Sequence, residues 1–384
     1  MIKNGYRNDC FVASVLLTLY ANFGELGGVE KLFRRIGDKD ITAWNSMILA
    51  GARPGHGSSH SMQLLQELCQ TTLLQIESAT WVAVLKSCEN ESDLVAAFVD
   101  IEWKDDSSWS SIIGTYKQND MELEALGLCN CKEMLNEGVN FTSYSLPLCF
   151  SACSQLSAIC EGKQLHVLAI KSGYNRDVYV GSSIIDMYAK CGNIEESENV
   201  FSEQLEPNEV IFNAMICGYA HHGKAQQAIE VFSKLEKNCV APNHVTFLAL
   251  MSACSHAGYV EETLHLFTLM LDKYKIKPKS EYYSSLVDAY GRAGRLEEAY
   301  QIVQKDGSES AWRTLLGACR NHNNTEIGEK SAMKMIEMNP SDHAPYVLLS
   351  NIYNAEGKWE EAIKCREKMA KIHVKKDPGN SWLV

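Results

Sequence analysis

The chain lacks the features of a membrane protein and of a disordered linker. Only 8 of its 384 residues are proline and no low-complexity tract interrupts it, which disfavours long disordered segments. Its longest apolar runs, such as VASVLLTL at 12–19, are much shorter than a membrane span, so we expect a soluble protein. The opening residues, MIKNGYRND, show neither a secretory signal nor an Arg- and Ser-rich organellar leader.

Catalytic and metal-binding motifs are also missing. A zinc nucleotide deaminase needs His-x-Glu and Cys-x-x-Cys to hold zinc, activate water and move protons, and none of the 11 histidines or 14 cysteines falls in these patterns. The nearest cysteine pairs are Cys129/Cys131 and Cys149/Cys153, and for the second pair buried packing is favoured over a metal site. The cysteines are scattered through apolar helical patterns, which suits a reducing compartment better than a secreted disulfide framework. We predict no catalytic residue, no metal and no cofactor.

Positive charge is scarce. Lys and Arg number 36 against 48 Asp and Glu, a formal net charge of -12. This balance argues against a general polyanion binder, because phosphate contacts need Lys and Arg, although a local basic face is compatible with it. The His221-His222 pair and the Lys-rich segment 371–379 are interpreted as solvated helix ends.

What the chain has is repetition. In five windows of equal length the second residue is Tyr and the sixth is Gly, and an amphipathic pattern follows. These windows are LYANFGELGGVEKLF (19–33), MYAKCGNIEESENVF (187–201), GYAHHGKAQQAIEVF (218–232), AYGRAGRLEEAYQIV (289–303) and IYNAEGKWEEAIKCR (352–366). The glycine fits the residue after a helix, where a positive φ is needed, and the pattern predicts a helix, a turn and a second helix.

Weaker copies of the window carry Cys in place of Tyr, as in FSACSQL and MSACSHAG. Successive markers lie about 35 residues apart, a period typical of repeats of two helices each. Since one such unit cannot bury its apolar face alone, neighbours must stack into a continuous core. The sequence therefore predicts an all-α protein, an α-solenoid superhelix of stacked helix-turn-helix repeats.

The repeat lengths and residue motifs resemble those of the pentatricopeptide repeat (PPR) family, specifically the plant type that cycles through ordinary, long and short repeats. Residues 143–177 resemble a long repeat, 178–208 a short one and 209–243 an ordinary one. AWRTLLGACRNHNN (311–324) and YVLLSNIYNAEGKWEEA (346–362) resemble the two motifs of the family's C-terminal E-type extension, which are similar to tetratricopeptide units. The chain ends DPGNSWLV, where a DYW-type deaminase domain would begin in the family.

The resemblance implies a division into four parts. These are 1–77, N-terminal repeats of which the first is partial; 78–105, a hybrid repeat; 106–308, further repeats; and 309–384, the extension. In the hybrid, the first helix of a long repeat (TWVAVLKSCEN) is joined to the last helix of a short one (AAFVDIEWKDD), as an internal loss of about one repeat length would give.

In this family each ordinary or short repeat reads one RNA base through its fifth and last residues. Carried over, the resemblance implies the pairs Ser14 with Asp40, Asn45 with Glu77, Ser110 with Thr142, Ser182 with Asn208, Asn213 with Asn243, and Ser284 with Ser308. Ser182 with Asn208 implies adenine, Asn213 with Asn243 a pyrimidine and Ser14 with Asp40 guanine; Glu77 and Thr142 fit the code poorly. Tyr179 and Val210 are the implied base-sandwiching residues. The alternative for every pair is helix capping, because Ser, Asn and Asp also favour helix starts.

The resemblance implies a sequence-specific single-stranded RNA-binding protein of a plant organelle, mitochondrion or chloroplast with the mitochondrion preferred. Its role would be site recognition in C-to-U RNA editing, with a DYW-type deaminase or other editing factors bound through the C-terminal extension. Three alternatives stay open: an RNA stability, splicing or maturation factor without editing, a protein-binding scaffold, and a truncated gene product whose leader and upstream repeats are missing.

Overall fold

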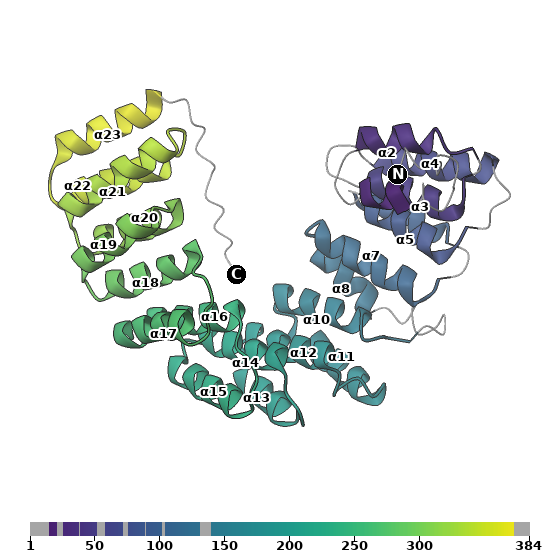
Figure 1. Cartoon of the computed structure of the whole chain (residues 1–384), viewed down its shortest axis with the longest axis horizontal. Coiled ribbons are helices and arrows are strands. Elements are labelled where there is room, and N and C mark those ends of the chain that lie inside the picture. Colours follow the sequence, from purple (N-terminus) through teal and green to yellow (C-terminus); the bar gives the residue numbers. More distant parts are fainter. Residues whose placement is uncertain are drawn as a thin grey trace. The chain divides into compact units, whose positions relative to one another are not determined.

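The computed structural model describes residues 15–20, 26–37, 39–51, 58–71, 76–88, 90–101, 104–130 and 140–371, and the regular structure in these ranges is helical throughout (Figure 1). This confirms the predicted all-α solenoid class. The helices of the N-terminal half are α2 (Leu26–Phe33), α3 (Ile41–Gly51), α4 (Ser58–Thr71), α5 (Ser78–Ser87), α6 (Glu91–Val99), α7 (Asp106–Gln118), α8 (Glu122–Asn130), α10 (Ser145–Leu156), α11 (Ile159–Lys171) and α12 (Val178–Lys190). Those of the C-terminal half are α13 (Ile194–Ser202), α14 (Glu209–His221), α15 (Ala225–Lys237), α16 (His244–His256), α17 (Val260–Asp272), α18 (Ser280–Arg292), α19 (Leu296–Asp306), α20 (Glu309–Asn321), α21 (Thr325–Met338), α22 (Ala344–Ala355) and α23 (Trp359–Lys371).

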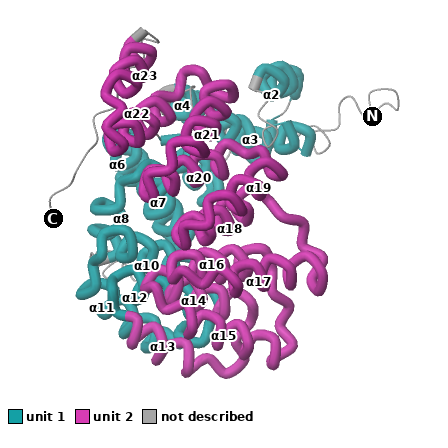
Figure 2. Tube along the Cα trace, turned by 90° about the vertical axis from the view of Figure 1, so that its left-hand side faces the viewer, with its two compact units in different colours: residues 1–193 teal, residues 194–384 magenta. Residues whose placement is uncertain are grey.

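The chain divides into two compact units, residues 1–193 and 194–384 (Figure 2). In unit 1 the first helices of successive pairs pack one on the next in the order α3, α5, α7, α10 and α12. In unit 2 the corresponding order is α14, α16, α18, α20 and α22. Within each unit a second helix packs both on its own first helix and on the first helix of the following pair, as α15 does between α14 and α16. Every pair is therefore stabilised by its neighbours, as expected for a solenoid.

The second helices bury one face because their apolar residues recur at helical spacing. In α15, Ala225, Ala228, Val231, Phe232 and Leu235 are buried, and the charged side chains lie on the other face. An aromatic residue near the end of a second helix often meets one on the next first helix edge-on. Such pairs are Phe33–Trp44, Phe98–Trp109, Phe201–Phe212, Phe232–Phe247 and Tyr300–Trp312, with ring centroids 4.9–5.8 Å apart.

The turn between the two helices of a pair has the left-handed residue that the windows predict. Gly192, Gly223, Gly294 and Gly357 all have positive φ, and the backbone N–H of Asn193, the residue after Gly192, donates to the carbonyl of Tyr188 at 2.9 Å. Gly24 lies outside the described residues. In the copies without glycine, Asp120, Ser157 and Asn323 hold the same left-handed conformation four residues after the marker.

In two repeats the tyrosine marker connects the first helix to the pair before it. The Tyr219 hydroxyl donates to Glu198 Oε1 on α13 at 3.0 Å, and in unit 1 the Tyr188 hydroxyl lies 3.0 Å from His166 Nδ1 on α11. Burial and then the Glu198 carboxylate raise the pKa of Tyr219. Where Cys replaces Tyr, at Cys153, Cys254 and Cys319, the side chain is fully buried. The marker therefore does more than set the turn: it contributes to stacking between repeats.

Residues 78–105, predicted as a hybrid repeat, contain a helix pair that packs like its neighbours. Its helices α5 and α6 pack on each other, and α5 packs between α3 and α7 like any other first helix. The stacking is continuous through this pair because α5 and α6 make the same contacts as their counterparts in the neighbouring pairs.

The cysteine expectation needs one correction. Cys129 on α8 and Cys149 on α10 form a disulfide, with Cα atoms 5.7 Å apart. Ten other described cysteines form no disulfide, so among the described residues this is a single cross-link between neighbouring repeats and not a disulfide framework. In the described ranges, no helix is both long and apolar enough to cross a bilayer.

Candidate RNA interface

The last residue of most predicted repeats is the N-cap of the next first helix. Asn208 is the N-cap of α14, where its Oδ1 accepts from the backbone N–H groups of Val210 and Ile211 at 3.1 and 3.2 Å. Asn243 caps α16 in the same way. Ser308 caps α20, and Asp40 accepts from the N–H of Ala43 at 2.8 Å at the start of α3. The capping interpretation of these last residues is confirmed. In each asparagine the side-chain oxygen accepts the capping bonds, and the amide N–H₂ group takes no part in capping.

The fifth residue lies on the first helix, one turn after its start. In unit 2, Asn213 and Asn243 meet: Asn213 Nδ2 donates to Asn243 Oδ1 at 3.3 Å. A third residue, Thr246, joins them, because its hydroxyl donates to Asn213 Oδ1 at 2.6 Å. The structure thus brings this predicted pair together in one hydrogen-bonded group, in which Asn213 and Thr246 are buried and Asn243 is half-buried.

The other predicted positions have varied surroundings. Ser182 on α12 donates to the Tyr179 carbonyl at 3.0 Å, and its partner Asn208 belongs to the other unit. Ser284 on α18 donates to Ser310 Oγ at 3.0 Å and so contacts the neighbour of Ser308. Ser14 lies outside the described residues.

Two fifth residues in unit 1 have no polar partner of this kind. Asn45 on α3 is half-buried, and its Oδ1 has no hydrogen-bond partner in the described ranges. Its counterpart Glu77 stands at the N-cap of α5 without a side-chain capping bond. Ser110 is half-buried on α7, while Thr142 accepts through its hydroxyl from the N–H of Ser145 at the start of α10.

The predicted base-sandwiching residues are accessible to a ligand. Tyr179, the second residue of α12, is 67% exposed although it is aromatic. Val210 is the second residue of α14 and is half-buried. Two other repeats have an apolar residue at the same position. Tyr144, which directly precedes α10, is 79% exposed, and Val245, in α16, is 41% exposed. An apolar side chain at this place is therefore a recurring exposed feature.

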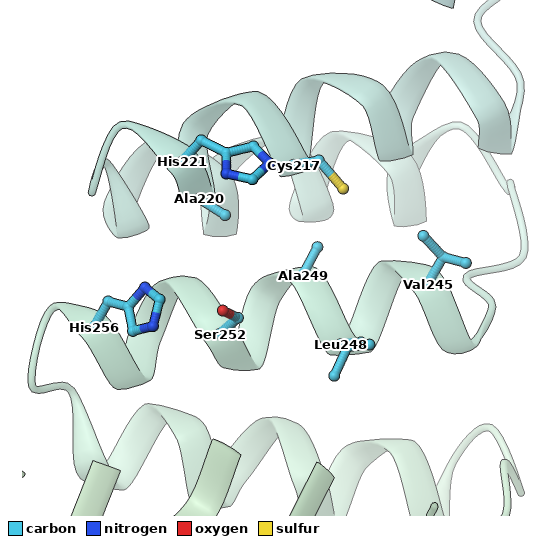
Figure 3. A pocket seen from close by; sticks show the side chains of 8 residues that line it. All are labelled: Cys217, Ala220, His221, Val245, Leu248, Ala249, Ser252 and His256. Atoms are coloured by element: carbon cyan, nitrogen blue, oxygen red, sulfur yellow. The ribbon is translucent and has the colours of Figure 1, made fainter. Parts of the chain in front are cut away.

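A shallow hollow follows Asn213 along the same face of α14. Cys217, Ala220 and His221 border it on α14, and Val245, Leu248, Ala249, Ser252 and His256 border it on α16, around a volume of about 380 Å³ (Figure 3). A second hollow of about 240 Å³ shares Ser252 and His256 and extends over α18 to Ser284, Asp288 and Thr314.

Successive first helices end in a basic residue. From the sequence, such residues are interpreted only as solvated helix ends. In unit 2, His221, His256 and Arg292 are the last residues of α14, α16 and α18 and are exposed. In unit 1, Lys190 ends α12 at the same repeat position. Arg292 pairs with Asp288 at 2.8 Å, and Lys190 pairs with Asp186 at the same distance. The signal was present in the aligned windows, where these residues share one column.

The cysteine thiols that occupy or adjoin the marker positions are buried or half-buried. Burial raises the pKa of Cys153, Cys254 and Cys319 to about 12, so these side chains stay protonated and poorly nucleophilic. Cys191, which caps α12, is half-buried, and burial raises its pKa as well. In the part of the chain that the structure describes, no three His, Cys, Asp or Glu side chains gather as metal ligands.

Family models match the chain from residue 182 onward. The PPR repeat model matches 182–203, 245–274 and 281–305, the PPR repeat family model matches 207–256, and the E motif model matches 322–384. The last match lies within the predicted extension.

Similar proteins cover the whole chain. A chloroplastic pentatricopeptide repeat-containing protein of Arabidopsis thaliana is 32% identical over 434 residues, covering 100% of this chain and 49% of the relative. A mitochondrial one from the same plant is 30% identical over 418 residues, covering 100% of this chain and 54% of the relative. The chain spans about half the length of these relatives.

Among solved structures, the PPR protein PPR10 in complex with an 18-nt psaJ RNA element matches 97% of this chain and 57% of its own, with a TM-score of 0.70 and 15% identity. This likeness concerns the fold. Together with the repeat and E motif matches and the plant relatives, it leads to one conclusion: the chain belongs to the pentatricopeptide repeat family and carries its E motif.

Proposed function

We propose that the chain is a sequence-specific single-stranded RNA-binding protein of a plant organelle. The observation that carries this proposal is the joined pair Asn213 and Asn243, a polar group presented at one end of a first helix. Exposed apolar residues such as Val245 lie beside it and are available to stack on bases. PPR10, a structural neighbour, is solved with RNA, and relatives carry chloroplastic or mitochondrial names.

The basic residues at the helix ends are the proposed phosphate contacts. They recur once per repeat in α14, α16 and α18, while the bases are proposed to lie at the opposite ends of the same helices. A chain with a net charge of -12 binds RNA only where basic side chains are presented locally, and these helix ends present Arg292 together with the imidazoles of His221 and His256. The arrangement separates the two tasks of RNA recognition, contact with phosphates and selection of bases.

RNA binding is tested by fluorescence anisotropy with labelled single-stranded RNA over a range of salt concentrations. Arg292→Gln should weaken binding to every sequence and lower the slope of log K against log salt by about 0.7, the value for one lost phosphate contact on a single strand. Asn213→Ser should change base preference at one nucleotide without changing that slope. Lys237→Gln, at the exposed end of α15, is the matched control and should change neither. Equal losses in the Lys237 and Arg292 variants would contradict the assignment.

We further propose that the bound RNA is a C-to-U editing substrate and that a deaminase supplied in trans docks on the C-terminal extension. The E motif match at 322–384 supports this proposal. Sequencing organellar transcripts from a plant that lacks the gene tests it, because at least one cytidine should stay unedited. A fully edited set with altered transcript abundance or splicing would assign the protein to RNA maturation instead.

A further inference from the structure

Thr246 joins the two proposed base-reading residues of one repeat. It is the third residue of α16 and is fully buried. Its Oγ1 accepts from the backbone N–H of Asn243 at 3.0 Å and donates to Asn213 Oδ1 at 2.6 Å. The inference drawn from this contact rests on the proposed function.

The orientation of the Asn213 amide follows from its neighbours. Asn243 Oδ1 is held as an acceptor by the backbone N–H groups of Val245 and Thr246, at 2.9 and 3.2 Å. The Asn213 atom that faces it at 3.3 Å must therefore be the donor, Nδ2, since two oxygens would repel each other. The remaining atom, Oδ1, faces the Thr246 hydroxyl at 2.6 Å, a separation typical of an O–H···O bond and short for N–H···O.

This orientation leaves the amide N–H groups as the unused donors of the pair. Asn243 Oδ1 accepts from three N–H groups and Asn213 Oδ1 faces the hydroxyl of the fully buried Thr246, while Asn243 Nδ2 and the second hydrogen of Asn213 Nδ2 have no acceptor in the described ranges. Cytosine offers two adjacent acceptors, N3 and O2, on its Watson–Crick edge. Uracil has an N3–H group there, which needs an acceptor oxygen, and both oxygens of this pair face donors of the protein itself.

We propose that Thr246 is a positioning residue that fixes the Asn213 amide through its hydroxyl and thereby makes this repeat prefer cytosine over uracil. Without the hydroxyl, the 3.3 Å contact with Asn243 Oδ1 alone holds the amide, so its orientation is less strongly fixed and discrimination between the two pyrimidines is reduced.

The chain contains natural comparisons for this arrangement. Ile211 takes the position of Thr246 beside Asn208, so no hydroxyl is available in that repeat. Thr80 takes the position beside Asn45, but Glu77 replaces Asn243, and both Thr80 Oγ1 and Asn45 Oδ1 are buried without a hydrogen-bond partner in the described ranges. A threonine is therefore not sufficient, and the capping asparagine is needed to orient the amide.

The experiment is selection from a random single-stranded RNA pool with the whole chain, followed by sequencing of the bound fraction. The nucleotide whose preference shifts in Asn213→Ser identifies the position read by this repeat. At that nucleotide, Thr246→Val, which keeps the shape and removes the hydroxyl, should lower the cytosine-to-uracil ratio about fivefold, the effect of one lost hydrogen bond. Thr246→Ser should retain the ratio, and Ile211→Val should leave it unchanged.

Thermal unfolding of each variant separates folding from recognition. An unchanged ratio in Thr246→Val, with or without a uniform loss of affinity, would overturn the positioning role, as would an equal loss in Thr246→Ser. Failure of the wild-type chain to enrich any RNA is a different result, and it would refute the proposed function itself.

Discussion

Glu77 is the point where a predicted base-reading pair lacks its hydrogen bonds. It stands at the N-cap of α5 in extended conformation, yet its side chain makes no capping bond. Thr80 Oγ1 and Asn45 Oδ1 are both buried without partners in the described ranges. In unit 2 the counterparts of all three are satisfied because Asn243 is short enough to cap its own helix and accept from Asn213. We therefore expect Glu77→Asn to stabilise unit 1.

The magnitude follows from the groups concerned. A good N-cap contributes about 1 kcal/mol, and satisfying a buried polar group contributes about 1–3 kcal/mol. Asn45 is only half-buried and the three groups act as one network, so their contributions do not add. We expect an increase of about 2 kcal/mol in the free energy of unfolding. For a unit of this size that corresponds to a rise in Tm of roughly 4–8 °C.

The assay is thermal and urea unfolding, with amide hydrogen exchange of α5 as a local measurement. Glu77→Ala is the matched control, since it removes the glutamate without supplying a cap. Asn243→Glu is the reverse change and should destabilise unit 2. If Glu77→Asn is no more stable than Glu77→Ala, the network does not form around an asparagine at this position and the reasoning is wrong.

Three further predictions concern the stacking of unit 2. Gly223→Ala should destabilise unit 2 by about 1 kcal/mol in urea unfolding, because Gly223 has a φ of +66°. No heavy atom among the described residues lies within 4 Å of the added Cβ, so the cost comes from the left-handed backbone alone. Tyr219→Phe should cost about 1 kcal/mol by the same measurement, since the bond to the half-exposed Glu198 is lost while the ring keeps its packing. Burial would raise the pKa of Glu236, but hydrogen bonds from Lys273 and Tyr274 outweigh burial and hold the pKa below its ordinary 4.5. The contribution of Glu236 to stability is therefore complete above pH 4.5 and is lost as the pH falls through the lowered pKa. The difference in stability between wild type and Glu236→Gln should disappear in acid. A difference that persists there would refute the assignment.

The sequence predicts the repeating elements well because their determinants are local. A glycine that ends a helix and apolar residues at helical spacing are contained in one window, so the helix pairs and their turns follow from it. Ser157 takes the same left-handed conformation as Gly192 without the residue type that signals it. Its position is found only by counting four residues from the Cys153 marker.

Contacts between repeats are harder to predict from the sequence. Cys129 and Cys149 pair across adjacent repeats at a separation of 20 residues, and no motif marks them. The bond from Tyr219 to Glu198 joins two repeats, and so does the bond from Thr246 to Asn213. Each depends on the register in which helices pack, which a single repeat does not encode.

Capping and base reading, treated as alternatives from the sequence, are compatible in the structure. Asn243 gives its oxygen to the start of α16 and keeps its N–H₂ group for another partner. Capping holds that oxygen in place, and the fixed oxygen in turn orients Asn213. A cap that is optimal for the helix therefore defines which atoms of the fifth residue face outward. Where the last residue caps poorly, as Glu77 does, the fifth residue loses its defined orientation, so the same substitution is expected to affect both stability and the proposed base preference.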